Sequence, residues 1–295
     1  MAPRLVTQAK LQVERARVRW PWFDIGMTTG KRFSEDDGGF YAAGLSYYIF
    51  FSIFPLLLFA TSILGYLALD ESTQEEIFKT GVKAVPLLED ALSPDGFKTI
   101  EDNRQGLAVT GFVLALYSGS GAIVALEHAL NVFNKVTQEP NFLKKRLRSL
   151  LLLAVLGAGA ILSVAATSAA GFVTDRLGGI GGIIASIGGY ALGVALSVAI
   201  FATAFRILPA TRTTWREVLP GAVAGALVFE ILKVIGAELM SGGGEGRNAT
   251  FGLFAAAAGL LVASYLVSQI ILLAAELNRV LAERRITRES TSGSR

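Results

Sequence analysis

Long apolar stretches separated by short charged breaks dominate the chain. The stretch Leu150–Val173 contains no charged residue. About 18 or more such residues in a row are enough to cross the roughly 30 Å hydrocarbon layer of a bilayer as a helix. Dividing the chain at its charged breaks gives six such segments, which predict an all-α, polytopic membrane protein with six transmembrane helices. The segments are Phe40–Leu69, Gly106–Val132, Ser149–Val173, Gly178–Phe205, Gly221–Met240 and Thr250–Val280.

The first segment is long enough to need a tilt or a kink. Its thirty residues would form a helix of about 45 Å, which exceeds the hydrocarbon thickness. Pro55 lies in the middle of the segment and cannot donate a backbone hydrogen bond, so it is the predicted kink site. Tyr41, Tyr48 and Ser52 precede it at helical spacing. We expect this polar stripe to face protein or a cavity rather than lipid.

The basic residues indicate the orientation of the chain. Of the 27 Lys and Arg residues, 20 lie in the N-terminal segment, the second and fourth connections and the C-terminal end. Because Lys and Arg favour cytoplasmic loops, both termini are predicted to be cytoplasmic. The first outer connection, residues 70–105, holds nine acidic and four basic residues. Its capping pattern at Ser72 and the helical spacing that follows predict an amphipathic helix on the outer face.

The chain therefore divides into three parts, a cytoplasmic segment 1–39, a transmembrane domain 40–280 and a cytoplasmic tail 281–295. The first part is basic and aromatic, since Arg17 and Arg19 stand beside Trp20 and Trp22. This composition is typical of segments that lie at the inner-leaflet interface, where anionic lipids attract cations. Direct attachment to a membrane span favours membrane lipids as partners and argues against nucleic acid.

Composition argues against an enzyme. Only 17% of the residues are charged, against about 25% in soluble domains. The chain has no cysteine and a single histidine, His128, so it cannot supply the His and Cys ligands of a zinc site. Neither a phosphate-binding loop nor a nucleophile motif is present. We therefore expect no metal, no cofactor and no enzymatic activity.

Glu230 is the foremost candidate for a functional residue. It lies ten residues beyond Pro220, about 15 Å into the fifth span and hence near the midplane. Lys233, at position i+3, can share its helix face and neutralise it. Ionisable residues at this depth are costly and often functional, which predicts a substrate site in a cavity that Tyr48 and Ser52 also line. The alternative is a structural ion pair, with Lys233 extending towards the interface.

Polar residues also end the second and sixth spans. Glu127, His128 and Asn131 close the second span, and Glu276 and Asn278 close the sixth. Because these positions are expected near the cytoplasmic interface, where side chains reach water, we interpret them as solvated helix ends.

Pairs of glycines separated by four residues recur in the later spans. Such pairs let two membrane helices approach closely. They are Gly178/Gly182, Gly189/Gly193 and Gly221/Gly225.

Several motifs resemble those of a known family, and together they cover about residues 35–282. They are AAGLSYY at Ala42–Tyr48, FSIFPLL at Phe51–Leu57, LPATR at Leu208–Arg212, WREVLPGA at Trp215–Ala222 and AELN at Ala275–Asn278. They are similar to the signatures of the YihY/BrkB family, except that Ala275 replaces a glycine. The resemblance implies a six-span protein of the bacterial inner membrane, in a family once labelled ribonuclease BN. It offers no agreed catalytic residues, and it directs attention to Pro55, Pro209, Arg212, Pro220, Glu230 and Glu276 as structural, gating or binding positions.

Three functions remain to be weighed. The midplane Glu230 and the polar stripe favour a transporter or flippase of a lipid, amphiphile or small solute. The basic N-terminus and the acidic outer connection fit a non-transporting scaffold or assembly factor of the cell envelope. A membrane-associated ribonuclease is the least favoured, because only scattered charged residues could serve it. The sequence leaves the substrate, the energy source and a homo-oligomeric state open.

Overall fold

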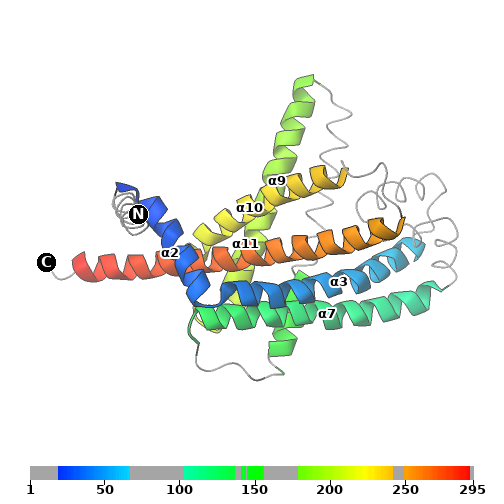
Figure 1. Ribbon diagram of the computed structural model, residues 1–295, viewed down its shortest axis with the longest axis horizontal. Coiled ribbons are helices and arrows are strands. Elements are labelled where there is room, and N and C mark those ends of the chain that lie inside the picture. The colour runs from blue at the N-terminus through cyan, green and yellow to red at the C-terminus, as the bar shows by residue number, and fades with distance from the viewer. Residues whose placement is uncertain are drawn as a thin grey trace, which may run out of the picture.

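The fold is a bundle of long helices (Figure 1). The computed structural model describes residues 19–66, 103–136, 141, 143, 145–155, 179–241 and 249–292, and these contain helices and connections but no strand. Residues 145–155 are helical. The longer helices are α2 (Pro21–Glu35), α3 (Gly38–Tyr66), α7 (Arg104–Phe133), α9 (Gly179–Ile207), α10 (Trp215–Ser241) and α11 (Ala249–Ser292).

Four helical stretches are long and apolar enough to cross a membrane. They are Gly38–Leu56, Gln105–Phe133, Ile187–Ile207 and Ala257–Thr287, and they confirm the first, second, fourth and sixth predicted segments as apolar helices. α10, the fifth, is 27 residues long but is not among the four; its charged residues include Arg216, Glu217, Glu230 and Lys233. Most of the third segment and nearly all of the predicted outer helix at 70–105 lie outside the described residues.

The helices pack in a definite order (Figure 1). α3 packs along α7, and α11 packs against α3 on one side and α10 on the other. α9 in turn packs against α10. Because α11 lies between α3 and α10, these two helices are not among the closely packed pairs of the described residues. α11 also continues without a break from the predicted last span into the predicted tail, and ends at Ser292.

The best-packed part of the bundle lies at one end of the spans. Its buried residues come from the start of α3, the end of α7, the end of α9, the start of α10 and the second half of α11. Leu130, Leu208 and Leu272 are almost fully buried there. This is the end that the basic residues assign to the cytoplasm, so the core coincides with the places where the connections join.

One glycine pair brings two helices into close contact. A Cβ atom added at Gly221 would collide with the carbonyl oxygen of Ala274, and one at Gly225 would lie 2.8 Å from Ala274 Cβ. α10 and α11 therefore approach closely because these positions lack side chains, which confirms the prediction for this pair. At Gly193 an added Cβ would meet nothing within 4 Å among the described residues, so the structure shows no close contact for that glycine there.

The polar stripe of the first span lies partly in the interface with α7. Tyr41 is half-buried, with its ring centroid 5.9 Å from that of His128, and Ser52 is buried, donating its hydroxyl to the Ile49 carbonyl at 2.7 Å. Tyr48 is half-exposed and covers Gly121 of α7. α3 continues through Pro55 as one helix.

α2 reverses into α3 through a tight turn. Asp36 caps α2, with its N–H donating to the Arg32 carbonyl, and Asp37 adopts the left-handed conformation with φ of 54°. This turn allows α2 to fold back across the second half of α11, where the two helices pack (Figure 1). Trp20 and Trp22 remain exposed on α2 and just before it.

Candidate functional site

Two asparagines hold the connection between α9 and α10. Asn131 of α7 accepts a hydrogen bond from the Ala210 N–H, with 2.8 Å between N and Oδ1. Asn278 of α11 accepts one from the Gly221 N–H, with 2.6 Å between N and Oδ1. Because each amide satisfies a backbone group of another element, the pair fixes where α10 begins relative to α7 and α11.

These residues correct the interpretation of the span ends. Glu127 and Glu276 have no exposed surface, and Asn131 and Asn278 are 1% and 8% exposed. The prediction of solvated helix ends is therefore wrong for these four side chains, whereas His128 is exposed. The physical reason is that the α9–α10 connection folds over the end of α7, while α2 folds back over α11 and removes both sets of positions from solvent.

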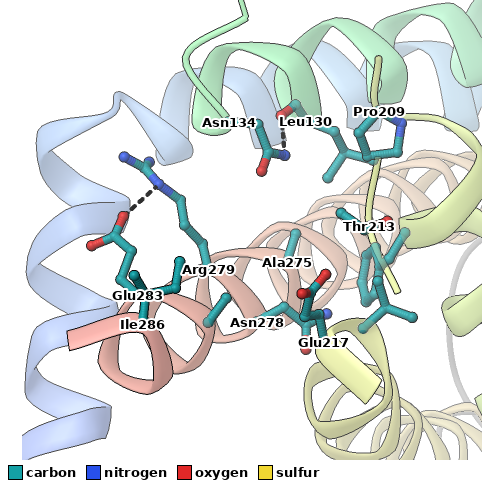
Figure 2. Close-up of a pocket in the computed structure, with 13 residues that line it drawn as sticks. Leu130, Asn134, Pro209, Thr213, Glu217, Ala275, Asn278, Arg279, Glu283 and Ile286 are labelled. Atoms are coloured by element: carbon teal, nitrogen blue, oxygen red, sulfur yellow. Dashed lines mark hydrogen bonds and ion pairs between the residues drawn. The ribbon is translucent and has the colours of Figure 1, made fainter. Parts of the chain in front are cut away.

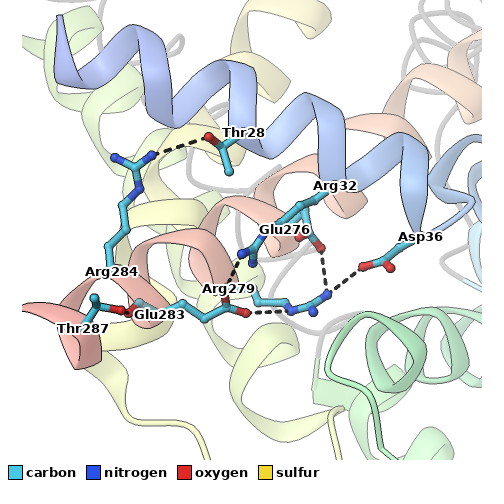
Figure 3. A network of polar contacts seen from close by, with 8 residues as sticks. All are labelled: Thr28, Arg32, Asp36, Glu276, Arg279, Glu283, Arg284 and Thr287. Atoms are coloured by element: carbon cyan, nitrogen blue, oxygen red, sulfur yellow. Dashed lines mark hydrogen bonds and ion pairs between the residues drawn. The ribbon is translucent and has the colours of Figure 1, made fainter. Parts of the chain in front are cut away.

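A group of ion pairs, which we name the α2–α11 clasp, joins α2 and its cap to the second half of α11 (Figure 3). Arg279 is its centre, with nitrogen–oxygen distances of 2.7 Å to Asp36, 3.4 Å to Glu283 and 3.7 Å to Glu276. The Arg279 side chain is only 13% exposed. Three carboxylates thus surround one largely buried guanidinium group, and its positive charge neutralises part of their negative charge.

Two further ion pairs complete the clasp. Arg32 of α2 donates to Glu283 at 2.5 Å, and Arg284 pairs with Asp24 and lies near the Thr28 hydroxyl. The hydrogen bond to Glu283 raises the pKa of Arg32 above its usual value, so this guanidinium stays charged. The clasp therefore consists of Asp24, Arg32 and Asp36 from α2 and its cap, and Glu276, Arg279, Glu283 and Arg284 from α11.

A pocket of about 250 Å³ lies beside the clasp, at the well-packed end of the spans (Figure 2). Its walls come from α7, α9, α10, α11 and the 208–214 connection. The apolar lining residues are Leu130, Phe205, Pro209, Val218, Ala275, Ala282 and Ile286. The polar ones are Asn134, Thr213, Glu217, Asn278, Arg279 and Glu283. The pocket thus offers a polar end and an apolar wall to the same ligand.

The start of α10 positions one of the pocket's charges. Glu217 stands three residues after Thr214, and its Oε2 accepts the Thr214 N–H at 2.8 Å. This is half of a capping box, which the spacing of threonine and glutamate in the sequence favours. Trp215 beside it packs under the Arg206 guanidinium, 4.2 Å from the ring centroid.

A second polar group lies deeper along α10. Glu230 Oε1 is 2.7 Å from Lys233 Nζ and accepts the Ser197 hydroxyl of α9 at 2.6 Å. The Glu230 side chain is 19% exposed and that of Lys233 46% exposed. The predicted pairing of these two residues at i and i+3 is therefore confirmed, and Ser197 is a third member that links two helices.

The structure separates the other predicted site residues. Tyr48 and Ser52 lie on α3, and α11 stands between them and Glu230. Pro209 lines the pocket, and Glu276 belongs to the clasp. Arg212 is exposed on the connection, and Pro220 lies inside the second turn of α10. Four predicted gating positions, Pro209, Arg212, Pro220 and Glu276, therefore lie at the well-packed end, whereas Pro55 lies farther along α3.

Sequence reasoning missed Asp36, Arg279 and Glu283 as a group. The spacing of Arg279 to Glu276 and Glu283, at i−3 and i+4, was a readable signal for ion pairing along α11. The partners on α2 had no such signal, since the Arg32–Glu283 pair joins residues 251 apart in the chain.

Several long apolar helices, ionisable residues buried among them and a polar connection folded onto the bundle end define a multi-pass helical membrane protein. Comparison with known sequences shows which family of such proteins it belongs to. The family described as virulence factor BrkB matches residues 29–295, so the chain belongs to the BrkB virulence factor family, as its motifs predicted.

Relatives agree with this class. The chain is 24% identical to the "Putative ribonuclease-like protein YfkH" of Bacillus subtilis, over 86% of this chain and 94% of that protein. It is 26% identical to the "UPF0761 membrane protein Smlt0865" of Stenotrophomonas maltophilia, over 92% of this chain but only 64% of that longer protein. A UPF0761 membrane protein of Methylibium petroleiphilum is 24% identical, over 72% of this chain and 52% of that protein. No solved structure matches.

One relative has a ribonuclease-like name, which describes that protein. No group of three or more His, Cys, Asp or Glu residues in the described part of this chain could hold a metal ion. BrkB and UPF0761 proteins form a membrane family and not a known enzyme family. The name is therefore no basis for assigning nuclease activity to this chain.

Proposed function

We propose that this protein is an inner-membrane transporter or flippase that moves a lipid, an amphiphile or a small solute. The observation that carries the proposal is the Glu230–Lys233–Ser197 group, in which a carboxylate, an ammonium and a hydroxyl meet between two apolar helices. Glu230 lies about 20 Å along α10 from Glu217 at 1.5 Å per residue. Ionisable groups at such depth are costly and are retained chiefly where they serve transport.

The partial exposure of this group gives a substrate access to it, since nearly half of the Lys233 side chain is exposed. A structural pair with Lys233 extended towards the interface would also leave that side chain exposed, so the variants below decide between the two. We infer that Lys233 can exchange Glu230 for a substrate while Glu230 stays bonded to Ser197. Since Tyr48 and Ser52 lie beyond α11, we assign the substrate contact to α9 and α10.

Transport is tested with purified protein in liposomes. Fluorescent phospholipids and a panel of small anions and cations are offered, and their movement is compared between wild type and Glu230→Gln. We expect Glu230→Gln to abolish movement, because the amide keeps the Ser197 hydrogen bond but loses the charge. Glu35→Gln, a change at an exposed carboxylate paired with Lys31, is the matched control and should transport normally.

A double variant separates a substrate site from a structural ion pair. Glu230→Gln combined with Lys233→Gln removes both charges, so no buried charge remains unpaired. If the pair were only structural, the double variant would transport as wild type does. We expect it to be inactive. Absence of movement for every cargo, with folded wild-type protein, would refute transport.

A scaffold of the cell envelope is the second candidate, and the α2–α11 clasp favours it. The clasp joins α2 to the second half of α11, and Trp20 and Trp22 are exposed on α2 and just before it. We propose that these two indole rings contact membrane lipid. Brominated lipids should then quench the tryptophan fluorescence, and unquenched fluorescence would exclude lipid as their partner. A scaffold would bind a partner protein and move no cargo, and Arg284→Gln, a change in the more exposed part of the clasp, should weaken that binding in folded protein.

A further inference from the structure

We propose that the pocket beside the clasp binds an amine-bearing amphiphile, with the ammonium group at Glu217 and a hydrogen-bond acceptor of the ligand at Asn278 and Thr213. This site lies about 20 Å along α10 from Glu230, and the inference does not depend on transport. It would hold for a transporter, where the pocket would be an entrance, and equally for a scaffold.

Two polar groups of the pocket point to a ligand with an acceptor. Asn278 is 92% buried and its Oδ1 is occupied by the Gly221 N–H, yet its Nδ2 has no hydrogen-bond partner among the described residues. The Thr213 hydroxyl is likewise buried and without a partner in that part of the chain. Leaving a buried donor unsatisfied costs about 1–3 kcal/mol, and a phosphate or hydroxyl oxygen of a ligand would remove that cost.

The charges around the pocket favour a cation over an anion. Of the charged residues that line it, Glu217 and Glu283 are acidic and Arg279 is basic. Arg279 is already bound to carboxylates of the clasp. Glu217 takes part in none of the ion pairs found between described residues, and one of its oxygens only accepts the Thr214 N–H. An ammonium group would form an ion pair with this carboxylate, whereas a purely anionic ligand would be repelled by its negative charge.

The remaining walls favour an amphiphile over a hydrophilic amine. Leu130, Phe205 and Val218 form the inner apolar wall, and Ile286 continues it outward with 67% of its surface exposed. The pocket holds about 250 Å³, which suits a headgroup rather than a whole lipid. A ligand whose tail leaves along Ile286 would stay in the membrane interface, the depth at which this end of the bundle is predicted to lie.

Titration calorimetry of the full-length protein in maltoside micelles tests the site, with empty micelles as reference. The probes are dihexanoyl phosphatidylethanolamine, dihexanoyl phosphatidylglycerol and octylamine. We expect the ethanolamine lipid to bind at least tenfold more tightly than the glycerol lipid. Binding of octylamine alone would assign the site to soluble amphiphilic amines. Equal affinity for the two lipids, or no binding of either amine, would overturn the proposal.

Matched variants locate the binding within the pocket. Glu217→Gln keeps the acceptor for the Thr214 N–H and should weaken both amines at least tenfold, while Glu35→Gln should leave them unchanged. Thr213→Val should weaken the ethanolamine lipid several-fold but not octylamine, which carries no acceptor. An unchanged thermal midpoint shows that each variant is folded. Wild-type affinity in folded Glu217→Gln would refute the site.

The test of amine binding and the test of transport can fail independently of each other. Glu230→Gln should bind the amine as wild type does, even where it no longer transports. Loss of amine binding in Glu217→Gln with transport of other cargo intact would retain the transporter and place this ligand outside its cycle.

Discussion

At the scale of single residues, Gly221 decides how α10 meets α11. Its N–H donates to Asn278 while its missing side chain leaves room for the Ala274 carbonyl. Both contacts need the two backbones to be close, and any side chain at this position would push them apart. The close approach in turn aligns Asn278 with the pocket, so a residue without a side chain shapes the site.

We predict that Gly221→Ala destabilises the protein. The added methyl group collides with backbone, which cannot move aside, and overpacking of this kind costs about 1–3 kcal/mol. The thermal midpoint of the purified protein should fall by several degrees. Gly193→Ala is the matched control, because an added Cβ there meets nothing within 4 Å and alanine favours helix. A Gly221→Ala protein as stable as Gly193→Ala would contradict the contact.

At the scale of elements, the clasp makes α2 and the second half of α11 a single unit. α2 is only 15 residues long, and a helix of that length is marginal by itself in water. Its stability must come from packing on α11 and from the ion pairs with Arg32, Asp36 and Asp24. Arg279 joins the two helices, because it contacts Asp36 at the end of α2 as well as the buried Glu276 of its own helix.

We predict that Arg279→Gln destabilises the protein far more than Arg284→Gln. Arg279 is 13% exposed and faces three carboxylates, so its loss leaves buried charge unpaired, at about 3 kcal/mol or more. The side chain of Arg284 is 33% exposed, and such a pair contributes about 1 kcal/mol or less. Thermal unfolding compares the two variants.

A second substitution tests the reason for that difference. If the unpaired charge of Glu276 is the cause, then Glu276→Gln added to Arg279→Gln should restore part of the lost stability. A double variant less stable than Arg279→Gln would show that Glu276 stabilises the protein by another route.

At the scale of the whole molecule, the arrangement gathers the polar features at one end. The clasp, the pocket and the two asparagine contacts all lie where the connections join, whereas the Glu230–Lys233 ion pair lies farther along α10. A ligand that approaches from this end would therefore reach the pocket before it reaches the Glu230 group. The distribution of basic residues predicts that this end faces the cytoplasm.

The orientation can be tested cleanly because the chain has no cysteine. We predict that single cysteines at Arg19, Thr214 and Ser290 resist a membrane-impermeant maleimide in intact cells. Single cysteines at Gln105 and Gly243 should react with it. Opposite behaviour of Thr214 and Gly243 would establish α10 as a span. Labelling of Ser290 in intact cells would refute a cytoplasmic C-terminus.

The sequence by itself determined the helices and the pairs within them. Backbone groups in hydrocarbon must be satisfied inside the segment, so an apolar run of sufficient length has to be a helix. This is why the spans at 40–69, 106–132, 178–205 and 250–280 were readable. The pairing of Glu230 with Lys233 could also be predicted, because residues three apart on one helix lie on the same face.

The tertiary structure alone decided which helices are neighbours and which side chains are buried. Helical spacing gives a face but not the partner of that face, so it could not show that α11 separates Ser52 from Glu230. Burial of Glu276 and Asn278 follows from α2 and the α9–α10 connection folding over the bundle end. The clasp and the pocket join residues from distant parts of the chain, and their contacts exist only once the helices have packed.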